Sequence, residues 1–225
     1  MTKTIIAIGD IHGRYDKLCA LRDEIKAYTA GESNDKFQLV FLGDYVDRGP
    51  QSKEVCDAVM KMQEHGAIAL RGNHEQMMID SKWGGDDWRM WSRNGGDASL
   101  VSFGNDWSEY AAWAATLPLF YETTNHFFVH AGVNPKYSLE HQVNEDLIWI
   151  RSPFLNCEED FGKYIVHGHT PTMYENQRRE GRLDNWAPVI KENRINIDTG
   201  AVFGGQLTAA VFDPAIRKPI KIIGV

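Results

Sequence analysis

The sequence is poor in cysteine and has no long hydrophobic run. Its three cysteines, Cys19, Cys56 and Cys157, are odd in number and form no Cys-x-x-Cys pair. Neither a disulfide framework nor a zinc knuckle is therefore expected. No apolar stretch approaches the roughly 18 residues of a membrane span, and the N-terminus has no cleavable hydrophobic region. We expect a cytoplasmic protein without a membrane partner.

Clustered positive charge is also lacking. The 225 residues include 24 Lys and Arg against 31 Asp and Glu, a formal net charge of −7. Nucleic-acid backbones are bound by clustered basic side chains, so a nucleic-acid partner is not expected. An acidic protein can still bind anions where metal ions dominate the local field. The length and the 43% hydrophobic content predict a single domain over residues 1–225.

The first part of the chain repeats a strand, loop and helix pattern. Apolar runs at 4–9, 37–42 and 67–70 predict strands, and helical spacing predicts helices at 15–28, at 52–64 and from about residue 75. Such units have right-handed crossovers and parallel strands. Since the carboxyl ends of parallel strands share one edge of the sheet, the three loops should meet in one crevice.

The second half contains further predicted strands, at 126–130, 164–167, 195–198, 206–212 and 220–223. We interpret these as a second, partly antiparallel sheet packed on the first. The polar segment at 175–194 is expected to be a solvated loop or hairpin without a special role.

Between the halves, residues 81–116 contain five of the seven tryptophans and two Gly-Gly pairs, and we predict a helical insertion there. Buried aromatic rings supply packing area where a segment has no sheet, so these rings are expected to form their own small core. The alternative is a lid that shapes a binding groove.

Short polar motifs follow the predicted strands: Gly-Asp-Ile-His-Gly at 9–13, Gly-Asp-Tyr-Val-Asp-Arg-Gly at 43–49, Arg-Gly-Asn-His-Glu at 71–75 and His-Ala-Gly at 130–132. Asp10 and His12 can chelate one cation through an oxygen and a nitrogen. Asp44 is placed to bridge to a second cation, for which the remaining ligands would be Asn73, His130 and His169. Taken singly, each aspartate could merely cap a helix, and a histidine could be a surface group. Together, in this order, they favour metal-dependent hydrolysis of phosphate esters.

With Gly-His-Thr at 168–170 added, this order resembles the calcineurin-like metallophosphoesterases. It is most similar to the bacterial and phage branch of the serine/threonine phosphoprotein phosphatases, from Asp10 to Asp-Thr-Gly at 198–200. The resemblance implies an α/β fold with two mixed β-sheets packed as a central sandwich flanked by helices, in four αββα layers. It assigns one metal to Asp10, His12 and Asp44, and the other to Asp44, Asn73, His130 and His169. His167 is interpreted as structural.

Two cations would lower the pKa of a bridging water, giving a hydroxide for in-line attack, and would neutralise charge on the phosphoryl oxygens. The leaving oxygen needs a proton, and His74, which follows Asn73, is the predicted general acid. Asp47 is the candidate, as in the family, for the carboxylate that keeps His74 protonated. The alternative for His74 is an ordinary residue at a helix N-terminus.

Arginine side chains match phosphate oxygens with paired hydrogen bonds, and the candidates here are Arg48, Arg151 and Arg71. The resemblance supports Arg48 and Arg151 more strongly than Arg71, for which a surface ion pair is the alternative. Glu75 is expected to begin the third helix, where its charge favours the helix dipole.

The predicted function is a metal-dependent phosphomonoester hydrolase acting on phosphoprotein or phosphopeptide substrates, as a serine/threonine or tyrosine phosphatase, with small phosphomonoesters also accepted. Mixed Asp, His and Asn ligands suit manganese, iron or zinc, and we expect two Mn²⁺ ions.

Two alternatives remain. Symmetrical dinucleoside tetraphosphate hydrolases share the metal motifs, but they resemble Val-Ala-Arg where this chain has Tyr-Val-Asp-Arg, and Asn-His-Asp where it has Asn-His-Glu. The other alternative is a catalytically inactive phosphoprotein-binding scaffold, which the intact motifs disfavour.

Overall fold

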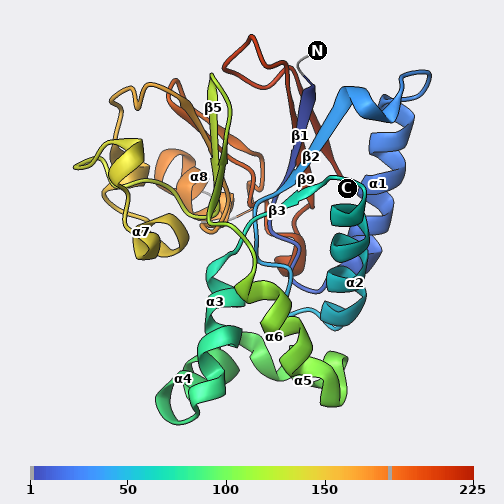
Figure 1. Ribbon diagram of the computed structural model, residues 1–225. Helices are drawn as coiled ribbons and strands as arrows, with labels where there is room; N and C mark the ends of the chain where they lie inside the picture. The colour runs from blue at the N-terminus through green and yellow to red at the C-terminus, as the bar shows by residue number, and fades with distance from the viewer. Residues whose placement is uncertain (1–2, 182–183) are drawn as a thin grey trace.

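Two five-stranded sheets lie face to face at the centre of the protein, in strand orders β10-β9-β1-β2-β3 and β4-β5-β6-β8-β7. The structure is a computed structural model and describes residues 3–181 and 184–225 (Figure 1). Helices cover the outer side of each sheet, so the predicted αββα layers are confirmed. No helix within these described ranges is long and apolar enough to cross a membrane.

The first sheet contains the predicted repeats. Its strands β1 (Thr4–Ile8), β2 (Phe37–Phe41) and β3 (Ile68–Ala69) are parallel, and they are connected through α1 (Tyr15–Tyr28) and α2 (Ser52–Glu64). Successive side chains of β1 point to opposite faces of the sheet, so the strand packs against a different layer on each face. Ile6 and Ile8 pack in the cluster that includes residues of α1 and α2, whereas Ile5 and Ala7 pack between the two sheets.

The second sheet is built around parallel strands β5 (His126–Val129), β6 (Tyr164–His167) and β8 (Arg194–Asn196). The strands β4 (Phe120–Glu122) and β7 (Val189–Ile190) pair antiparallel at its edges. Helices α7 (Asn144–Trp149) and α8 (Thr172–Glu180) lie on its side away from the first sheet (Figure 1).

The predicted sheet assignment of the last two strands was wrong. β9 (Thr208–Phe212) and β10 (Lys221–Gly224) belong to the first sheet, where β9 pairs antiparallel with β1. All five residues of β9 are buried, with Val211 in the cluster beneath the helices and Ala210 and Phe212 between the sheets. A strand covered on both faces reads as one apolar run, which does not say which sheet it joins.

The segment at 175–194 was also predicted wrongly, because it contains part of α8 and a buried ion pair. The guanidinium of Arg194 is fully buried and donates hydrogen bonds to the carboxylate of Glu175 on α8. The same guanidinium lies 3.0 Å from Nε2 of His167, which supports the structural interpretation of that histidine. Charged residues that pair with each other can be buried, even in a segment whose polar composition is typical of a solvated loop.

The tryptophan-rich segment is largely helical. After α3 (Asn73–Asp80) the chain forms α4 (Gly85–Trp91), a π-helical turn at Ser92–Gly96, α5 (Asp97–Phe103) and α6 (Trp107–Ala115). We call residues 85–115 the helical cap, which lies below both sheets in Figure 1. The rings of Trp88, Trp91 and Trp107 form a small aromatic core, whereas Trp113 packs on Tyr45 and Trp83 is 85% exposed. Short 3₁₀ turns complete the fold at Asn34–Lys36, Ser81–Trp83, Gly104–Asp106, Leu139–His141, Phe154–Asn156 and Ala201–Phe203.

Candidate metal centre

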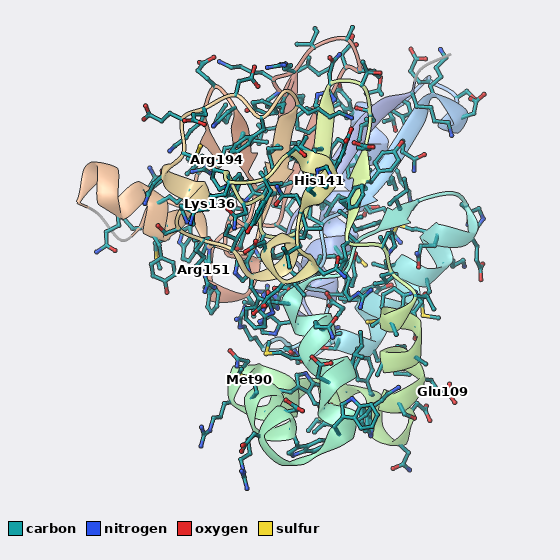
Figure 2. The ribbon with its side chains drawn as sticks, turned by 60° about the vertical axis from the view of Figure 1, so that its left-hand side comes forward. Met90, Glu109, Lys136, His141, Arg151 and Arg194 are labelled. Atoms are coloured by element: carbon teal, nitrogen blue, oxygen red, sulfur yellow. The ribbon has the colours of Figure 1, made fainter. Side chains whose placement is uncertain are left out.

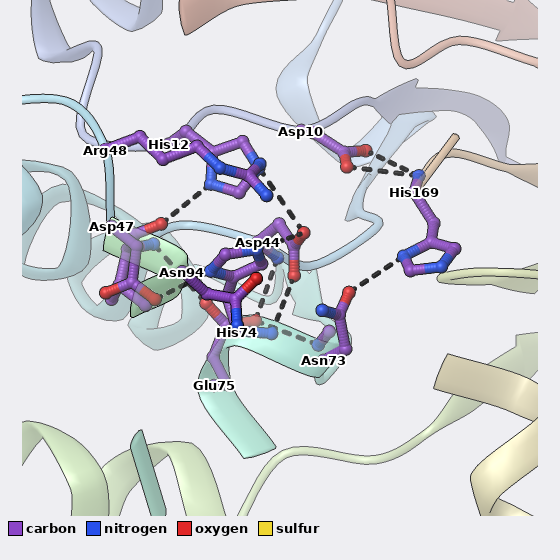
Figure 3. Close-up of polar contacts among 12 residues, drawn as sticks. Asp10, His12, Asp44, Asp47, Arg48, Asn73, His74, Glu75, Asn94 and His169 are labelled. Atoms are coloured by element: carbon purple, nitrogen blue, oxygen red, sulfur yellow. Dashed lines mark hydrogen bonds and ion pairs between the residues drawn. The ribbon is translucent and has the colours of Figure 1, made fainter. Parts of the chain in front are cut away.

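The proposed metal ligands follow the carboxyl ends of parallel strands from both sheets. Asp10 and His12 come after β1, Asp44 after β2, and Asn73 after β3. The second sheet contributes His130 after β5 and His169 after β6. All six side chains are buried. Figure 3 shows the side chains of Asp10, His12, Asp44, Asn73 and His169 gathered in one place. The predicted ligands are therefore brought together, from segments far apart in the sequence.

One group of donor atoms surrounds Asn73. Its Oδ1 lies 2.9 Å from Nε2 of His130 and 2.8 Å from Nδ1 of His169, and Oδ1 of Asp44 is 3.3 Å from the same Nε2. Nδ1 of His130 donates to the carbonyl of Leu42 at 2.9 Å, and burial lowers the pKa of this histidine. Its Nε2 therefore carries no proton, and the lone pair of this nitrogen faces two oxygens. Two ligand atoms about 2.1 Å from one cation and at right angles lie about 3 Å apart, so a cation fits here.

A second group lies on the other side of Asp44. Nδ1 of His12 donates to the carbonyl of Val46 at 2.8 Å, and its Nε2 lies 3.4 Å from Oδ2 of Asp44. Burial, and then the positive charge of Arg48, lower the pKa of His12 well below its usual value. The guanidinium of Arg48 contacts this Nε2, so a cationic group already lies against the lone pair.

The carboxylate of Asp10 is the remaining proposed ligand. It accepts the backbone N–H of His169 at 3.1 Å. Burial, followed by the nearby carboxylates of Asp198 and Asp44, raises the pKa of Asp10 well above its usual value. A bound cation would offset this repulsion, so the acidic and imidazole groups present fit a pair of divalent cations.

The backbone of the centre is held in unusual conformations. The non-glycine residues with positive φ, between 48° and 74°, are His12, Asp44, Asp47, Arg48 and His169. Each such residue costs about 1 kcal/mol or more and persists only where its surroundings hold it. Two glycines are required by close approach: a Cβ on Gly72 would lie 2.2 Å from Oδ1 of Asp44, and one on Gly168 would lie 2.0 Å from Oδ1 of Asp10.

Glu75 has a larger role than the sequence indicated. Helix α3 begins at Asn73, and the buried carboxylate of Glu75 accepts backbone N–H groups from Asp44 and Tyr45 at 2.8 Å and from Gly72 at 2.9 Å. It thus fastens the loop after β2 to the loop after β3. The spacing of a capping box was the only available signal, and it indicates the bond to Gly72 alone.

The predicted acid and its carboxylate are in contact. Nδ1 of His74 lies 2.6 Å from Oδ2 of Asp47, and both side chains are buried. Nε2 of His74 lies 4.0 Å from Oδ2 of Asp44, so this nitrogen faces the metal centre. Asp47 also accepts hydrogen bonds from Trp91 and Ser99 of the helical cap, neither of which the sequence singled out.

The three arginines differ in position. Arg48 lies beside the centre, with its guanidinium 5.3 Å from the centroid of the exposed Phe203 ring. Arg151 is exposed and lies on the side toward the part of the cap that carries Met90 (Figure 2). Burial lowers the pKa of both His130 and His169, and the charge of Arg151 adds to this lowering. Arg71 is directed elsewhere, since its guanidinium donates to Oε1 of Gln76 at 2.9 Å and to the carbonyl of Leu117 at 3.1 Å.

Two other polar residues near the centre were given no role in the sequence analysis. Asp198, buried at the end of β8, lies close enough to raise the pKa of Asp10, and burial raises its own pKa to about 7. Asn94, in the π-helical turn of the cap, lies near Asp47 and His74 in Figure 3. The strand-end position of Asp198 was a usable signal, whereas nothing in the sequence pointed to Asn94.

The chain is similar to known phosphatases and tetraphosphatases over most of its length. It is 33% identical to a serine/threonine-protein phosphatase 1 of Salmonella typhimurium, over 90% of this chain and 89% of that protein. It is also 33% identical to the asymmetrical bis(5'-nucleosyl)-tetraphosphatase PrpE of Bacillus velezensis, over 91% of this chain and 87% of that protein.

A solved structure, provisionally assigned as a diadenosine tetraphosphatase, superposes with a TM-score of 0.72 over 100% of this chain and 94% of the other. The two share 21% sequence identity, so this likeness concerns the fold alone. The model of the calcineurin-like phosphoesterases matches residues 3–205. The chain therefore belongs to the calcineurin-like phosphoesterase family and is a hydrolase that acts on phosphate esters.

Proposed function

We propose that the protein is a metal-dependent phosphomonoesterase that acts on phosphoproteins, with phosphoserine and phosphothreonine as its substrates and phosphotyrosine as a further one to test. The observation that carries the proposal is the pair formed by His74 and Asp47, with Nε2 of His74 facing the proposed metal ligands. When the phosphate ester of a serine or threonine is hydrolysed, the side-chain oxygen leaves as a basic alkoxide, which needs a proton from such a group.

The metal ligands in this proposal are two sets that share Asp44. The first set is Asp10, His12 and Asp44, and the second is Asp44, Asn73, His130 and His169. When bound, the two cations supply an activated water nucleophile and neutralise charge on the phosphoryl group. We propose Mn²⁺ as the activating metal. Metal-stripped protein should regain more activity with Mn²⁺ than with Zn²⁺ or Fe²⁺, and a greater recovery with either of these would contradict that choice.

The other roles belong to side chains of the chain itself. His74 donates the proton of its Nε2 to the leaving oxygen, and Asp47 orients the imidazole through the hydrogen bond to Nδ1. Arg48 and Arg151 hold the phosphoryl oxygens with charge-assisted hydrogen bonds. Arg71 is left out of this set, because its guanidinium is already bound to Gln76 and Leu117.

Hydrolysis of dinucleoside tetraphosphates is the second candidate. The similarity to the tetraphosphatase from Bacillus velezensis supports this candidate, because that enzyme is as identical to this chain, at 33%, as the protein phosphatase from Salmonella typhimurium is. That relative is an asymmetrical tetraphosphatase, whereas the motifs around Asp47 and Glu75 distinguish this chain from the symmetrical tetraphosphatases. Asp47 and Glu75 support the phosphatase, since the symmetrical enzymes resemble Val-Ala-Arg and Asn-His-Asp in these two motifs and so lack both residues. The inactive scaffold is the weakest candidate, because Asp44 lies in groups with His12 and with His130 and His169 that could hold a metal ion, and His74 contacts Asp47.

The deciding experiment compares substrates with metal-stripped protein reloaded with Mn²⁺. Phosphate release is measured from phosphoserine, phosphothreonine and phosphotyrosine peptides and from p-nitrophenyl phosphate. Diadenosine tetraphosphate is followed by chromatography, since the symmetrical cut gives ADP alone and the asymmetrical cut gives ATP and AMP. The proposal predicts a higher kcat/KM on phosphopeptides than on the tetraphosphate. Efficient cleavage of the tetraphosphate alone would overturn it, and absence of all turnover would favour the scaffold.

A further inference from the structure

A tryptophan of the helical cap reaches the proposed acid pair. Trp91, the last residue of α4, is fully buried, and its indole Nε1 lies 3.0 Å from Oδ1 and 3.1 Å from Oδ2 of Asp47. A buried indole normally finds one acceptor for its N–H. Here the acceptor is the carboxylate that contacts His74, although Trp91 and Asp47 are far apart in the sequence.

A second group from the cap holds the same carboxylate. Oγ of Ser99, on α5, donates to Oδ1 of Asp47 at 2.7 Å and accepts the backbone N–H of Asp47 at 2.7 Å. Ser99 and Asp47 are both fully buried. Oδ1 thus accepts hydrogen bonds from both cap residues, whereas Oδ2, which Trp91 also contacts, accepts the hydrogen bond from His74.

The cap is itself fitted closely to this position. A Cβ on Gly96 would lie 2.7 Å from the Trp91 ring, so glycine is needed for the π-helical turn to pass over the indole. The carbonyl of the neighbouring Gly95 accepts the backbone N–H of Arg48 at 3.2 Å. The cap therefore contacts two successive residues of the loop after β2, Asp47 and Arg48, both of which have positive φ.

We propose that Trp91, together with Ser99, is a positioning residue for the reaction: the helical cap holds the carboxylate of Asp47 so that Asp47 orients His74 toward the leaving group. This inference rests on the proposed function, in which His74 is the general acid. Without the two donors from the cap, the buried carboxylate of Asp47 would be free to rotate away from Nδ1 of His74. The insertion is then a part of the catalytic apparatus as well as a small aromatic core.

The test uses the basicity of the leaving group. Proton donation matters most when the leaving oxygen is strongly basic, as in phenyl phosphate, and least with p-nitrophenyl phosphate. Trp91→Phe removes the indole N–H and keeps an aromatic ring. We expect kcat on phenyl phosphate to fall about 10-fold or more and kcat on p-nitrophenyl phosphate to fall at most about 3-fold, with the metal content unchanged. Trp113→Phe is the matched control, because its indole donates at 2.9 Å to Gln63, away from the centre, and both substrates should be unaffected.

A combined variant adds a readout that a merely structural role would not move. If Trp91 acts through His74, Trp91→Phe should have little further effect in a protein that already carries His74→Asn. An equal loss on both substrates, or a full further loss in the combined variant, would overturn the proposal. If Trp91→Phe does not fold, Ser99→Ala tests the same claim with the same expected outcomes.

Failure of the underlying function gives a different result. If the unaltered protein does not hydrolyse either ester, the proposed function fails. If His74→Asn lowers kcat equally for both esters, the assignment of the acid fails before the role of the cap is reached.

Discussion

A single carboxylate, that of Asp44, is in contact with both halves of the centre. Its Oδ2 lies 3.4 Å from Nε2 of His12, and its Oδ1 lies 3.3 Å from Nε2 of His130. Oδ1 also accepts the backbone N–H of His74 at 3.1 Å. The residues that would bind metal and the residue that would donate the proton therefore share one fixed group. Substitutions around Asp44 should separate metal binding from proton donation.

Replacing the proposed acid should lower turnover without releasing metal. His74→Asn removes the donating nitrogen but none of the proposed ligands, so kcat should fall about 10²- to 10⁴-fold. Metal content is measured by mass spectrometry on the same sample. The exposed His65 offers a matched control in His65→Asn, which should change neither quantity. A parallel loss of metal and activity would mean that His74 is structural to the site.

The arginines should divide into two kinds. Arg151→Ala removes an exposed guanidinium whose charge acts on His130 and His169, and kcat/KM for p-nitrophenyl phosphate should fall about 10- to 100-fold. Arg71→Ala breaks hydrogen bonds to Gln76 and Leu117, so the thermal midpoint should fall while kcat/KM stays within about 3-fold. Steady-state kinetics and thermal unfolding of both variants check this division. The opposite pattern would return Arg71 to the phosphate-binding set.

At the scale of elements, the N-terminus of α3 joins two strand-end loops. Gly72 is its N-cap and Glu75 its third residue, and the carboxylate of Glu75 reaches across to the loop after β2. The first turn of α3 thus fixes the backbone of Asp44 and Tyr45.

Glu75→Gln should therefore destabilise the fold. An amide has one acceptor oxygen in place of two, so at least one buried backbone N–H would lose its partner. We expect the free energy of unfolding to fall by about 2 kcal/mol or more, measured by urea denaturation of chelated protein. Glu64→Gln, at an exposed position on α2, is the matched control. Equal stabilities of the two variants would contradict the role given to Glu75.

Local pattern was sufficient to predict some elements and not others. The bounds of α1 and α2 were predicted correctly, because their apolar residues recur at helical spacing between clear turn motifs. The sheet of β9 was predicted wrongly, since its partner β1 lies at the other end of the chain. Arg194 and Glu175 were assigned to solvent because their pairing is a tertiary contact.

The same distinction applies to the site. The proposed ligands share strand-end motifs, so the sequence indicated them, and the structure brings four of them, His12, Asp44, His130 and His169, into groups that could hold a metal ion. The contact of Trp91 with Asp47 and the bonds of Glu75 to the loop after β2 join residues from different units of the fold. No periodicity within one segment carries that information.

At the scale of the whole molecule, the two sheets are held together by packing between their facing sides. Phe128 of β5 and Phe212 of β9 meet there with ring centroids 5.8 Å apart. His126 is buried beside them, with its Nε2 3.0 Å from the carbonyl of Ile216 and 3.1 Å from that of Arg217. This histidine thus joins β5 of the second sheet to the loop that follows β9 of the first.

His126 should make stability depend on pH. Burial lowers its pKa in the folded protein below the unfolded value of about 6.5, so the unfolded chain binds the proton more readily. The contribution of neutral His126 is complete above about pH 7 and is lost as the pH falls through the unfolded pKa toward the lower folded value. The charges nearest to it belong to Arg217 and Asp213.

Urea denaturation between pH 5 and pH 8 should therefore show the unaltered protein losing more stability on acidification than His126→Gln does. Glutamine keeps a donor for the two carbonyls and does not titrate. The exposed His65→Gln variant should follow the unaltered protein. Parallel curves for His126→Gln and the unaltered protein would refute this effect.

The most direct test of a dinuclear centre bridged by one carboxylate is calorimetric titration of Mn²⁺ into chelated protein. We predict binding of about two equivalents to the unaltered protein, and an affinity about 10-fold or more weaker for both in Asp44→Asn. The exposed control Asp106→Asn should bind as the unaltered protein does. A single equivalent in the unaltered protein, or one site of full affinity in Asp44→Asn, would contradict the bridging role of Asp44.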